Sequence, residues 1–349
     1  MAERIRIAVV YGGQSSEHAV SVVSAGSVIA ALDRSKYDVV TVGITAGGEW
    51  LTTELNPAEI GFAQPQLPSV AGSGVEVSIL GKDSAVVELD SVDVVFPVLH
   101  GKNGEDGTIQ GLLELAGVPY VGSGVLASSV SMDKAFTKTI LTAAGLLVTP
   151  YVLARRGRPV RVLDVEHLGL PLFVKPARAG SSVGVSRVTS YDQLADALET
   201  AFSYDSKALI EAAMTGREIE CGVLEDADGS LSASLPAEIR LRPGYDWYDF
   251  DAKYLDDATD FDIPPQVAPE QIAAVQAAAC RTFEALECSG LARVDGFLAE
   301  DGQFVVNEVN TMPGFTPISM YPRMWAESGV AYPQLLDRLI ATARARAAR

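Results

Sequence analysis

The sequence predicts a protein of mixed α/β and α+β class in three domains, and two features of its pattern carry this prediction. In the first third, apolar runs of strand length alternate with helical patterns, as in a parallel α/β sheet. Beyond about residue 124, shorter strand-like runs predict an antiparallel α+β unit instead. We therefore expect an N-terminal domain over residues 1–123, a central domain over 124–217 and a C-terminal domain over 218–349.

The elements of the N-terminal domain are predicted from its apolar runs. The expected strands are Arg6–Tyr11, Val39–Ile44 and Val92–Leu99, the expected helices are Ser16–Asp33 and Thr108–Ala116, and Tyr120-Val121 is a further short run. The stretch Asn56–Asp83 contains proline and glycine and has weak periodicity, so we expect a loop-rich insertion there.

The later elements follow from the same reading. Expected helices are Ala127–Ala144, which ends at the Gly145 breaker, Tyr191–Phe202 and a terminal surface helix over Tyr332–Arg349. Expected strands are Leu172–Lys175, Val183–Val188 and Ala208–Glu211, and a third region begins around Glu218–Leu224. The crowded aromatic and acidic stretch Arg242–Asp257 suits no regular element, and a long loop of this kind is typical of a lid.

The composition of the chain argues against several kinds of partner and cellular compartment. A formal net charge of −18 argues against nucleic acid or an acidic membrane as a partner, because both require a basic surface. The three cysteines are an odd number without metal-ligand spacing, which predicts a reduced, cytoplasmic setting. The N-terminal apolar run is too short for a signal peptide, and no stretch is apolar enough to span a membrane.

One hairpin suggests a metal site. In RVDGFLAEDGQFVVNEVN, residues 293–310, an Asp-Gly pair between two apolar runs predicts a two-residue turn that pairs Glu300 with Gln303. Counting back sets Phe297 opposite Val306, Asp295 opposite Glu308 and Arg293 opposite Asn310, all on one face. Facing carboxylates repel, and an all-oxygen cluster suits Mg²⁺ or Mn²⁺. The competing interpretation is a solvated hairpin whose carboxylates are neutralised by Arg293.

Two further segments suggest an anion site. The run VKPARAGSSVGV, residues 174–185, places Lys175 before a loop of small residues whose N–H groups can approach a phosphate, although an ordinary hairpin turn fits as well. Lys134 begins a helix in SMDKAFTK, with Ser131 and Asp133 as candidate caps. By itself Lys134 would be interpreted as an exposed helical lysine.

Residues at the ends of the N-terminal strands suggest a ligand at that edge of the sheet. Glu17 follows the first strand and begins a helix, where it suits either the helix dipole or a substrate ammonium group. His100 and Glu105 follow the last strand, at the edge where open α/β sheets bind ligands. The glycine fingerprint of nicotinamide-dependent dehydrogenases is absent, which disfavours that class.

Taken together, these segments resemble the ATP-grasp superfamily and, within it, the D-alanine–D-alanine ligase family. Eight segments carry the resemblance in the family's order, namely GGQSSEHAVS, HGKNGEDGTIQG, MDK, KPARAGSSVGV, EAAMTGREIE, YDFDAKY, ARVDGF and NEVNTMPGFTPIS. It covers essentially the whole chain. The implied fold has three domains, with an N-terminal Rossmann-like domain before the two ATP-grasp subdomains. In one departure from the family, Ala212-Ala213 stand where other members carry a lysine and a bulky residue.

The resemblance implies roles for individual residues. It places ATP against Lys134, Lys175, Ser181, Ser182, Glu211, Met214 and Glu218. It places two Mg²⁺ or Mn²⁺ ions on Asp295, Glu308 and Asn310. It places D-alanine against Glu17, His100, Lys253, Ser319 and Met320. The implied catalytic residues are Glu17, Ser181, Tyr254, Arg293 and Gly314.

The implied reaction is ATP-dependent ligation of two D-alanine molecules for peptidoglycan precursors. The first carboxylate takes the γ-phosphoryl group, and the second amine attacks the resulting acyl phosphate. The Lys253-Tyr254 pair resembles the dipeptide-forming members rather than those that accept D-lactate, whereas D-serine stays open. A homodimer is expected from the family. The alternatives are another ATP-grasp carboxylate–amine ligase and a non-catalytic nucleotide-binding regulator.

Overall fold

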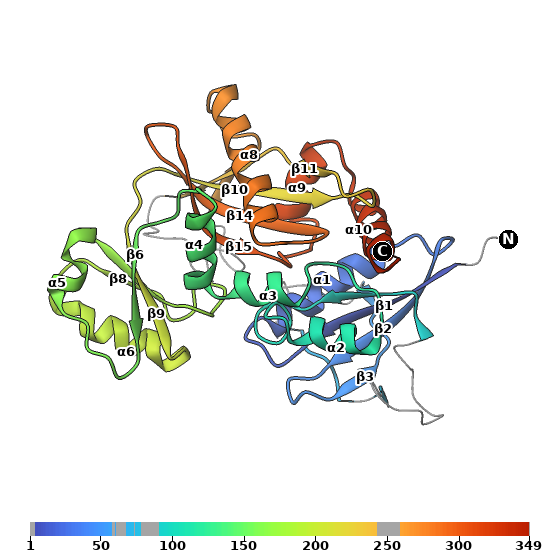
Figure 1. The fold of residues 1–349 in the computed structure, drawn as a ribbon. Helices are drawn as coiled ribbons and strands as arrows, with labels where there is room; N and C mark the ends of the chain where they lie inside the picture. The colour runs from blue at the N-terminus through green and yellow to red at the C-terminus, as the bar shows by residue number, and fades with distance from the viewer. Residues whose placement is uncertain are drawn as a thin grey trace.

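The computed structural model describes residues 4–57, 60, 68–72, 74–77, 91–242 and 259–348. Their strands form three sheets, which follow one another along the chain (Figure 1). The N-terminal sheet, the central sheet and the C-terminal sheet are described in that order.

The N-terminal sheet has the strand order β4-β3-β2-β1-β5. Its elements are β1 (Ile5–Gly12), α1 (His18–Ala31), β2 (Tyr37–Ile44), β3 (Trp50–Thr52), β4 (Val75–Glu76), β5 (Val94–Val98) and α2 (Thr108–Ala116). The predicted parallel arrangement is confirmed for β1, β2 and β5. Two short strands at the far edge, β3 and β4, were not predicted and pair antiparallel, and β4 lies within the predicted loop-rich stretch Asn56–Asp83. The predicted run at Tyr120 forms one parallel bridge to Val95.

The helical stretch after the N-terminal domain is broken at Asp133. The single helix predicted over Ala127–Ala144 is instead α3 (Val125–Met132) followed by α4 (Lys134–Ala143). Asp133 has extended backbone angles, and its carboxylate accepts hydrogen bonds from the N–H groups of Ala135 and Phe136. A capping aspartate satisfies the first N–H groups of a helix, which stops α3 and starts α4 at one residue.

The central sheet is antiparallel throughout, as predicted, with the order β6-β9-β7-β8. Its elements are β6 (Tyr151–Arg155), α5 (Val162–Val165), the 3-10 helix Glu166–Leu168, β7 (Leu172–Pro176), β8 (Ser186–Val188), the 3-10 helix Tyr191–Gln193, α6 (Leu194–Tyr204) and β9 (Lys207–Ala212). The strand predicted over Val183–Val188 begins only at Ser186, because Gly184 has a φ of +74°, outside the range of a strand.

The C-terminal sheet has the order β13-β12-β10-β14-β15, with β11 beside β10. Its elements are β10 (Arg217–Glu225), β11 (Leu231–Ala233), β12 (Ala237–Leu241), β13 (Thr259–Asp262), α8 (Pro269–Ala285), β14 (Leu291–Leu298), β15 (Phe304–Asn310), α9 (Met320–Glu327) and α10 (Tyr332–Ala347). The predicted terminal helix is confirmed as α10. The hairpin of the sequence analysis is β14 and β15.

The turn of this hairpin is longer than predicted. The N–H groups of Ala299 and Gly302 bond to Gln303 O and Ala299 O, each at 2.9 Å, so the loop holds three residues, 300–302. Gly302 has a φ of +83°, as expected for the left-handed residue that closes a three-residue hairpin loop. The longer loop shifts the register by one residue. Phe297 therefore faces Val305, and the predicted partner Val306 is wrong.

A β-bulge then restores the predicted register at the other end. The register shifts between Asp295 and Gly296, where β15 contributes Asn307 as one extra residue. Asp295 consequently faces Glu308, and Arg293 faces Asn310, as predicted. The pairing at the chemically important end is confirmed although the predicted turn is wrong.

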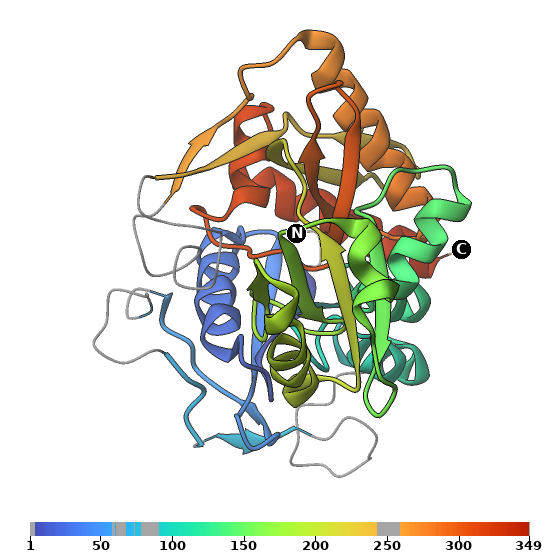
Figure 2. The same cartoon turned by 90° about the vertical axis from the view of Figure 1, so that its left-hand side faces the viewer.

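The buried apolar residues form separate cores of different sizes. One large core joins β1 and β5 to residues of the C-terminal part, among them Phe315, Tyr321 and Leu336. The central sheet has a separate core beneath α6, which includes Leu172, Val174 and Ile210. In Figure 2 the central sheet and α6 face the viewer. None of the helices in the described part of the chain combines the length and apolarity needed to cross a bilayer.

Candidate active site

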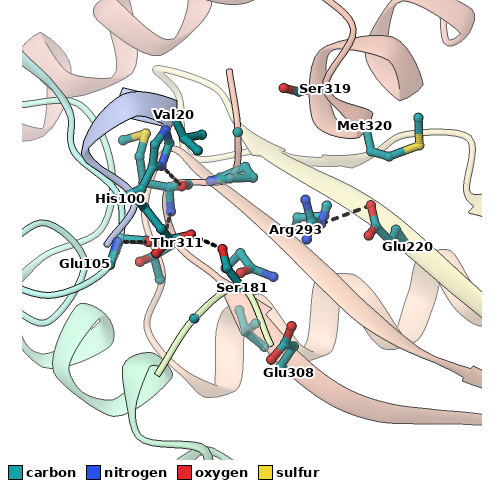
Figure 3. A pocket seen from close by; sticks show the side chains of 18 of the residues that line it. Val20, His100, Glu105, Ser181, Glu220, Arg293, Glu308, Thr311, Ser319 and Met320 are labelled. Atoms are coloured by element: carbon teal, nitrogen blue, oxygen red, sulfur yellow. Dashed lines mark hydrogen bonds and ion pairs between the residues drawn. The ribbon is translucent and has the colours of Figure 1, made fainter. Parts of the chain in front are cut away.

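Two pockets meet where the three sheets approach one another. The first pocket lies among the end of β5, the start of α1, β14, β15 and the start of α9 (Figure 3). The second pocket lies between the central sheet and the strands β10, β14 and β15. The residues that line both pockets are Lys134, Ala179, Gly180, Ser181 and Glu308. A ligand in one pocket can therefore reach a ligand in the other at these residues.

The second pocket contains every residue expected to contact ATP. Its lining includes Lys134, Lys175, Ser181, Ser182, Glu211, Met214 and Glu218. These residues come from α4, from β7 and the loop after it, from the end of β9, from the segment between β9 and β10, and from the start of β10. Residues far apart in sequence thus meet in the predicted combination.

Both lysines of the second pocket are held by polar groups. Lys134 Nζ lies 3.3 Å from Glu308 Oε2 and donates to the carbonyl of Ala179 at 2.9 Å. Lys175 Nζ lies 2.8 Å from Glu211 Oε2 and donates to Asn307 Oδ1 at 3.0 Å. The interpretation of Lys134 as an exposed helical lysine is therefore wrong, since its side chain is only 11% exposed.

Glu17 connects the N-terminal domain to the small-residue loop. Its Oε1 accepts a hydrogen bond of 2.5 Å from Ser181 Oγ, and its side chain makes no capping bond to α1. A Cβ atom at Gly101 would lie 2.6 Å from Glu17 Oε2, and one at Gly180 would lie 2.8 Å from it. Two glycines therefore leave the space that this carboxylate occupies.

The loop that meets Glu17 has an unusual backbone. Ser181 and Ser182 have φ values of +49° and +58°, a region that residues with a side chain rarely adopt. Two consecutive residues of this kind cost on the order of 2 kcal/mol or more. Such conformations concentrate at binding sites, where the surrounding structure holds them in place.

Arg293 lies at the centre of the first pocket, between carboxylates. Its Nε and Nη2 donate to the two oxygens of Asp295, each at 2.7 Å, in a bidentate arrangement. Its Nε also lies 3.1 Å from Glu220 Oε2, a contact drawn in Figure 3. Glu220, Asp295 and Glu308 stand opposite one another on β10, β14 and β15. Three carboxylates in a row require cations between them.

The predicted metal ligands are brought together. Asp295 and Glu308 are cross-strand partners, and Asn310 Nδ2 donates to Asp295 Oδ2 at 2.9 Å, which leaves its amide oxygen as a possible ligand. Within the described residues no group of three or more His, Cys, Asp or Glu side chains is arranged to hold a metal ion. An oxygen set of two carboxylates and one amide, with phosphate as a further ligand, nevertheless suits Mg²⁺ or Mn²⁺. The residues present fit such ions.

His100 is buried, which favours the uncharged form of its ring. Burial lowers the pKa of its ring, an effect that the neighbouring Glu17 only partly opposes. Nδ1 lies 2.9 Å from Met312 O, and a carbonyl can only accept, so we assign the proton to Nδ1. Nε2 then accepts from Ser24 Oγ at 3.2 Å. Both ring nitrogens are thereby engaged in holding the N-terminal domain to the segment after β15.

Glu105 reinforces the same junction. Its two oxygens accept hydrogen bonds from Gly101 N at 2.7 Å and Met312 N at 3.0 Å. Burial, with the charge of Glu17, raises the pKa of Glu105 to about 8. His100 and Glu105 both line the first pocket, and both contact the backbone of Met312. Together they fix the position of the main chain at Met312.

The remaining substrate residues lie at the opposite end of the first pocket. Gly314, Ser319 and Met320 all line it. Ser319 precedes α9, and its Oγ lies 2.8 Å from Thr316 Oγ1. The predicted Lys253 and Tyr254 lie outside the described residues, as does the predicted lid Arg242–Asp257 apart from Arg242.

Three residues of the site were missed from the sequence. Glu220 could have been found, because it follows the assigned Glu218 by two residues and side chains at that spacing share one face of a strand. Lys138, whose Nζ lies 3.2 Å from Glu211 Oε1, follows Lys134 by one helical turn, but helical lysines are usually exposed. Asn307 enters the site only through the β-bulge, for which the sequence has no signal.

Two family models match the chain. The model described as D-ala D-ala ligase N-terminus matches residues 6–123, and that described as D-ala D-ala ligase C-terminus matches residues 140–341. Together they cover most of the sequence.

Known proteins resemble the chain over nearly its full length. A D-alanine–D-alanine ligase of Mycolicibacterium vanbaalenii is 55% identical, with 99% of each chain covered. The VanG D-Ala:D-Ser ligase of Enterococcus faecalis is 36% identical, with a TM-score of 0.83 and coverage of 98% of this chain and 100% of that one. A D-alanine–D-alanine ligase of Bacillus anthracis, solved with ATP, is 33% identical, with a TM-score of 0.76 and coverage of 98% and 97%.

Proposed function

The chain belongs to the D-alanine–D-alanine ligase family, and from this premise we propose that its two joined pockets hold ATP and two D-alanine molecules side by side. The enzyme uses ATP to ligate two D-alanine molecules for peptidoglycan synthesis, with release of ADP and phosphate. The observation that carries the assignment of the pockets is their shared wall, where Lys134, Ser181 and Glu308 face both. Phosphoryl transfer between two ligands requires such a shared wall.

We assign the second pocket to ATP. Lys134 and Lys175 both line it and supply the charge for its phosphates, while Glu218 suits the ribose and Met214 the adenine. The pocket also contains Phe173 and Phe297, whose rings offer apolar surface to a base. No nucleophile from the protein is required, because phosphoryl transfer depends on positioning and charge neutralisation.

Asp295, Glu308 and Asn310 are the residues that would hold two Mg²⁺ or Mn²⁺ ions. When bound, such ions neutralise developing charge on the phosphates and orient them. Lys134 and Arg293 lie against Glu308 and Asp295 and offset their negative charge. Positive charge at these carboxylates is therefore a requirement of the fold as well as of the reaction.

In the first pocket, Glu17 binds the ammonium group of the first D-alanine. Its carboxylate accepts a hydrogen bond from Ser181 of the shared wall, so a substrate held by Glu17 has its own carboxylate directed toward the γ-phosphate. Arg293 and the N–H of Gly314 stabilise the oxyanion that forms when the second amine attacks. Glu220 and Asp295 fix the guanidinium from two sides, which preorganises it for that step.

The second D-alanine occupies the end of the first pocket near α9. Ser319 and Lys253 receive its carboxylate, and Met320 borders its side chain. His100 acts through Met312 rather than on substrate, because both of its ring nitrogens are engaged. Tyr254 completes, with Ser181 and Glu17, the contact that closes the lid over the reactants.

The wider assignments are proposals on the same premise. Domain boundaries near residues 123 and 217 agree with the three sheets, although α3 and α4 pack on β15 of the C-terminal sheet. We propose a cytoplasmic homodimer. Leu115 and Leu126 support it, because they are 84% and 60% exposed on two helices, α2 and α3, that contact each other.

The experiment that tests the function is a coupled assay of phosphate release by the purified enzyme. Release from ATP is expected only with Mg²⁺ or Mn²⁺ and D-alanine together, and mass spectrometry should identify the dipeptide. Release without D-alanine, or a product other than the dipeptide, would overturn the proposal.

D-serine as the second substrate is the one competing specificity that an observation favours, namely the likeness to VanG. A competition assay separates the two specificities: D-alanine is supplied with an equal concentration of D-serine or D-lactate, and the products are quantified by mass spectrometry. We expect D-alanyl-D-alanine to dominate at neutral pH. An excess of the D-serine dipeptide would show that D-serine is the preferred second substrate. An excess of the D-lactate ester would refute the role given to Lys253 and Tyr254.

A further inference from the structure

Lys138 carries a buried charge that neither pocket contacts. It lies on α4, four residues after Lys134 and therefore on the same face of the helix. Its side chain is 1% exposed, and it is not among the residues that line either pocket. A lysine in this position cannot touch a nucleotide or a substrate, so any effect on the reaction must pass through other residues.

The contacts of Lys138 lead to the second pocket through one carboxylate. Its Nζ lies 3.2 Å from Glu211 Oε1, while the other oxygen, Oε2, lies 2.8 Å from Lys175 Nζ. Lys175 in turn donates to Asn307. Glu211 is therefore shared between one lysine that faces the pocket and one that does not.

This arrangement is costly unless the charge has a use. Beyond the Glu211 contact, the described residues provide Lys138 Nζ with no hydrogen-bond acceptor. Burying an ammonium group with so few partners is unfavourable, and an apolar side chain of similar volume is often tolerated as well or better. Stability alone therefore does not explain a lysine at residue 138.

The balance of charge gives a reason. Lys138 and Lys175 with Glu211 carry one net positive unit. Without Lys138, the charge of Glu211 would neutralise Lys175 alone, and the pocket would lose that unit. With Lys138 present, its ammonium group offsets the negative charge of Glu211. The positive charge of Lys175 is then available to a ligand in the second pocket.

We propose that Lys138 is a positioning residue for ATP, which compensates Glu211 so that Lys175 presents its charge to the nucleotide phosphates. The inference rests on the proposed assignment of the second pocket to ATP. Electrostatics agree: burial lowers the pKa of Lys138 to about 8, with Glu211 opposing, so the group is charged at pH 7. Burial would raise the pKa of Glu211, but Lys138 and Lys175 lower it overall.

The competing explanation is purely structural, with Lys138 serving to anchor α4 to β9. The two explanations differ in what they predict for the phosphates. An anchor that loosens should weaken all nucleotide contacts alike, whereas a lost charge should weaken only the phosphate contacts. The ratio of the adenosine Kd to the ADP Kd isolates the phosphates and cancels effects on the base and ribose.

The test is a double-mutant cycle with calorimetry of ADP and adenosine at pH 7 without metal ions. Lys138→Met should lower the ratio about tenfold, the effect of one unit charge a few ångströms away at intermediate dielectric. Glu211→Gln should raise it above wild type. The double variant restores one net positive unit and should return the ratio to within about threefold of wild type.

Controls separate charge from packing. Lys138→Arg keeps the charge and should keep the ratio. Lys207→Met removes another buried lysine beside α4, the one paired with Asp133, and should lower the melting temperature without changing the ratio. Should Lys138→Met fail to fold, the comparison of the double variant with Glu211→Gln still decides. Loss of the Lys138 charge should lower the ratio in that background as well, whereas loss of an anchor should leave the ratio unchanged.

Each failure has its own signature. A wild-type ratio near one would refute the ATP assignment itself. A large wild-type ratio that neither Lys138→Met nor Glu211→Gln changes would refute only the role of Lys138. A double variant with a lower ratio than Lys138→Met would also refute it, because compensation of charge predicts recovery.

Discussion

Lys134 Nζ lies 3.3 Å from Glu308 Oε2, which joins the first residue of α4 to the middle of β15. The lysine was expected at a phosphate and the glutamate at a metal ion. Their contact places the two functions at one point, on the wall shared by both pockets. It also answers how the facing carboxylates of β14 and β15 are tolerated, because Lys134 offsets Glu308 as Arg293 offsets Asp295.

Replacing Glu308 should abolish most turnover without unfolding the protein. Glu308→Gln removes the carboxylate expected to bridge the ions, and we expect phosphate release to fall at least about 100-fold. The side chain is 23% exposed, so the melting temperature should change little. Asp301→Asn, the same chemical change at the exposed hairpin loop, is the control. Turnover within twofold of wild type for Glu308→Gln would refute the metal assignment.

Turnover should depend on the planar shape of the Arg293 guanidinium group as well as on its charge. Arg293→Lys keeps a cation but loses the bidentate contact with Asp295, so kcat should fall about 100-fold or more. Arg293→Met also leaves Glu220 and Asp295 side by side without a cation, and unfolding in urea should show a loss of about 3 kcal/mol or more. Equal kcat for Arg293→Lys and wild type would contradict the oxyanion role.

The hydrogen bond between Ser181 and Glu17 should matter for D-alanine. Ser181→Ala removes the donor to a carboxylate, and kcat/KM for D-alanine should fall about tenfold or more, the usual worth of a bond to a charged group. Ser203→Ala removes an exposed hydroxyl on α6 that bonds only locally, and it should have no effect. A loss of equal size in both variants would point to general damage instead.

Glu105 should make stability depend on pH. Its pKa is about 8 in the folded protein against 4.5 for the free side chain, so between these values the folded state binds the extra proton. The free energy of unfolding should therefore fall as pH rises through this window, by up to about 1.4 kcal/mol per pH unit. Burial is the main cause, with Glu17 adding to it.

The check is urea denaturation of wild type and Glu105→Gln from pH 5 to 8. The amide cannot accept from both Gly101 and Met312, so the variant should be less stable than wild type at pH 5. Because the amide does not titrate, the difference should narrow toward pH 8. A constant difference across the range would show that Glu105 is already ionised at pH 5.

Local sequence signals predicted the regular elements better than their irregular joints. The helix Thr108–Ala116 and the strands around Lys175 and Glu211 follow from apolar patterns and lie where predicted. The break at Asp133 was predicted only in part. Asp133 was a candidate cap of a helix that begins at Lys134, which is confirmed, but the helical pattern over Ala127–Ala144 continues through it and predicts one helix. Irregularities that depend on one side chain leave the periodicity of the sequence almost unchanged.

The hairpin shows how a correct pairing can arise from an incomplete argument. A two-residue turn with regular pairing gives the same partners for Asp295 and Arg293 as a three-residue loop followed by a bulge at Asn307. The sequence does not distinguish these solutions, because both satisfy the alternation near the metal end. Only the pairs between the bulge and the turn differ between them, such as the partner of Phe297.

The buried polar residues mark the other limit of prediction. Lys138 and Glu220 function through partners on other elements, and their environment is set by the packing of helix and sheets that a single sequence does not define. Resemblance to the family supplied the remaining site residues, which the isolated segments left open between ordinary and functional interpretations.

The separate core of the central sheet has a consequence for cooperativity. Because β6–β9 and α6 share few apolar contacts with the large core, their opening free energy is set largely by their own packing. Backbone amides there should exchange with solvent through partial unfolding, ahead of those in β1 and β5. A nucleotide bound between Lys134 and Lys175 would contact both the central sheet and the part of the protein that packs on the C-terminal sheet. Binding should therefore couple the unfolding of these two parts into one cooperative transition.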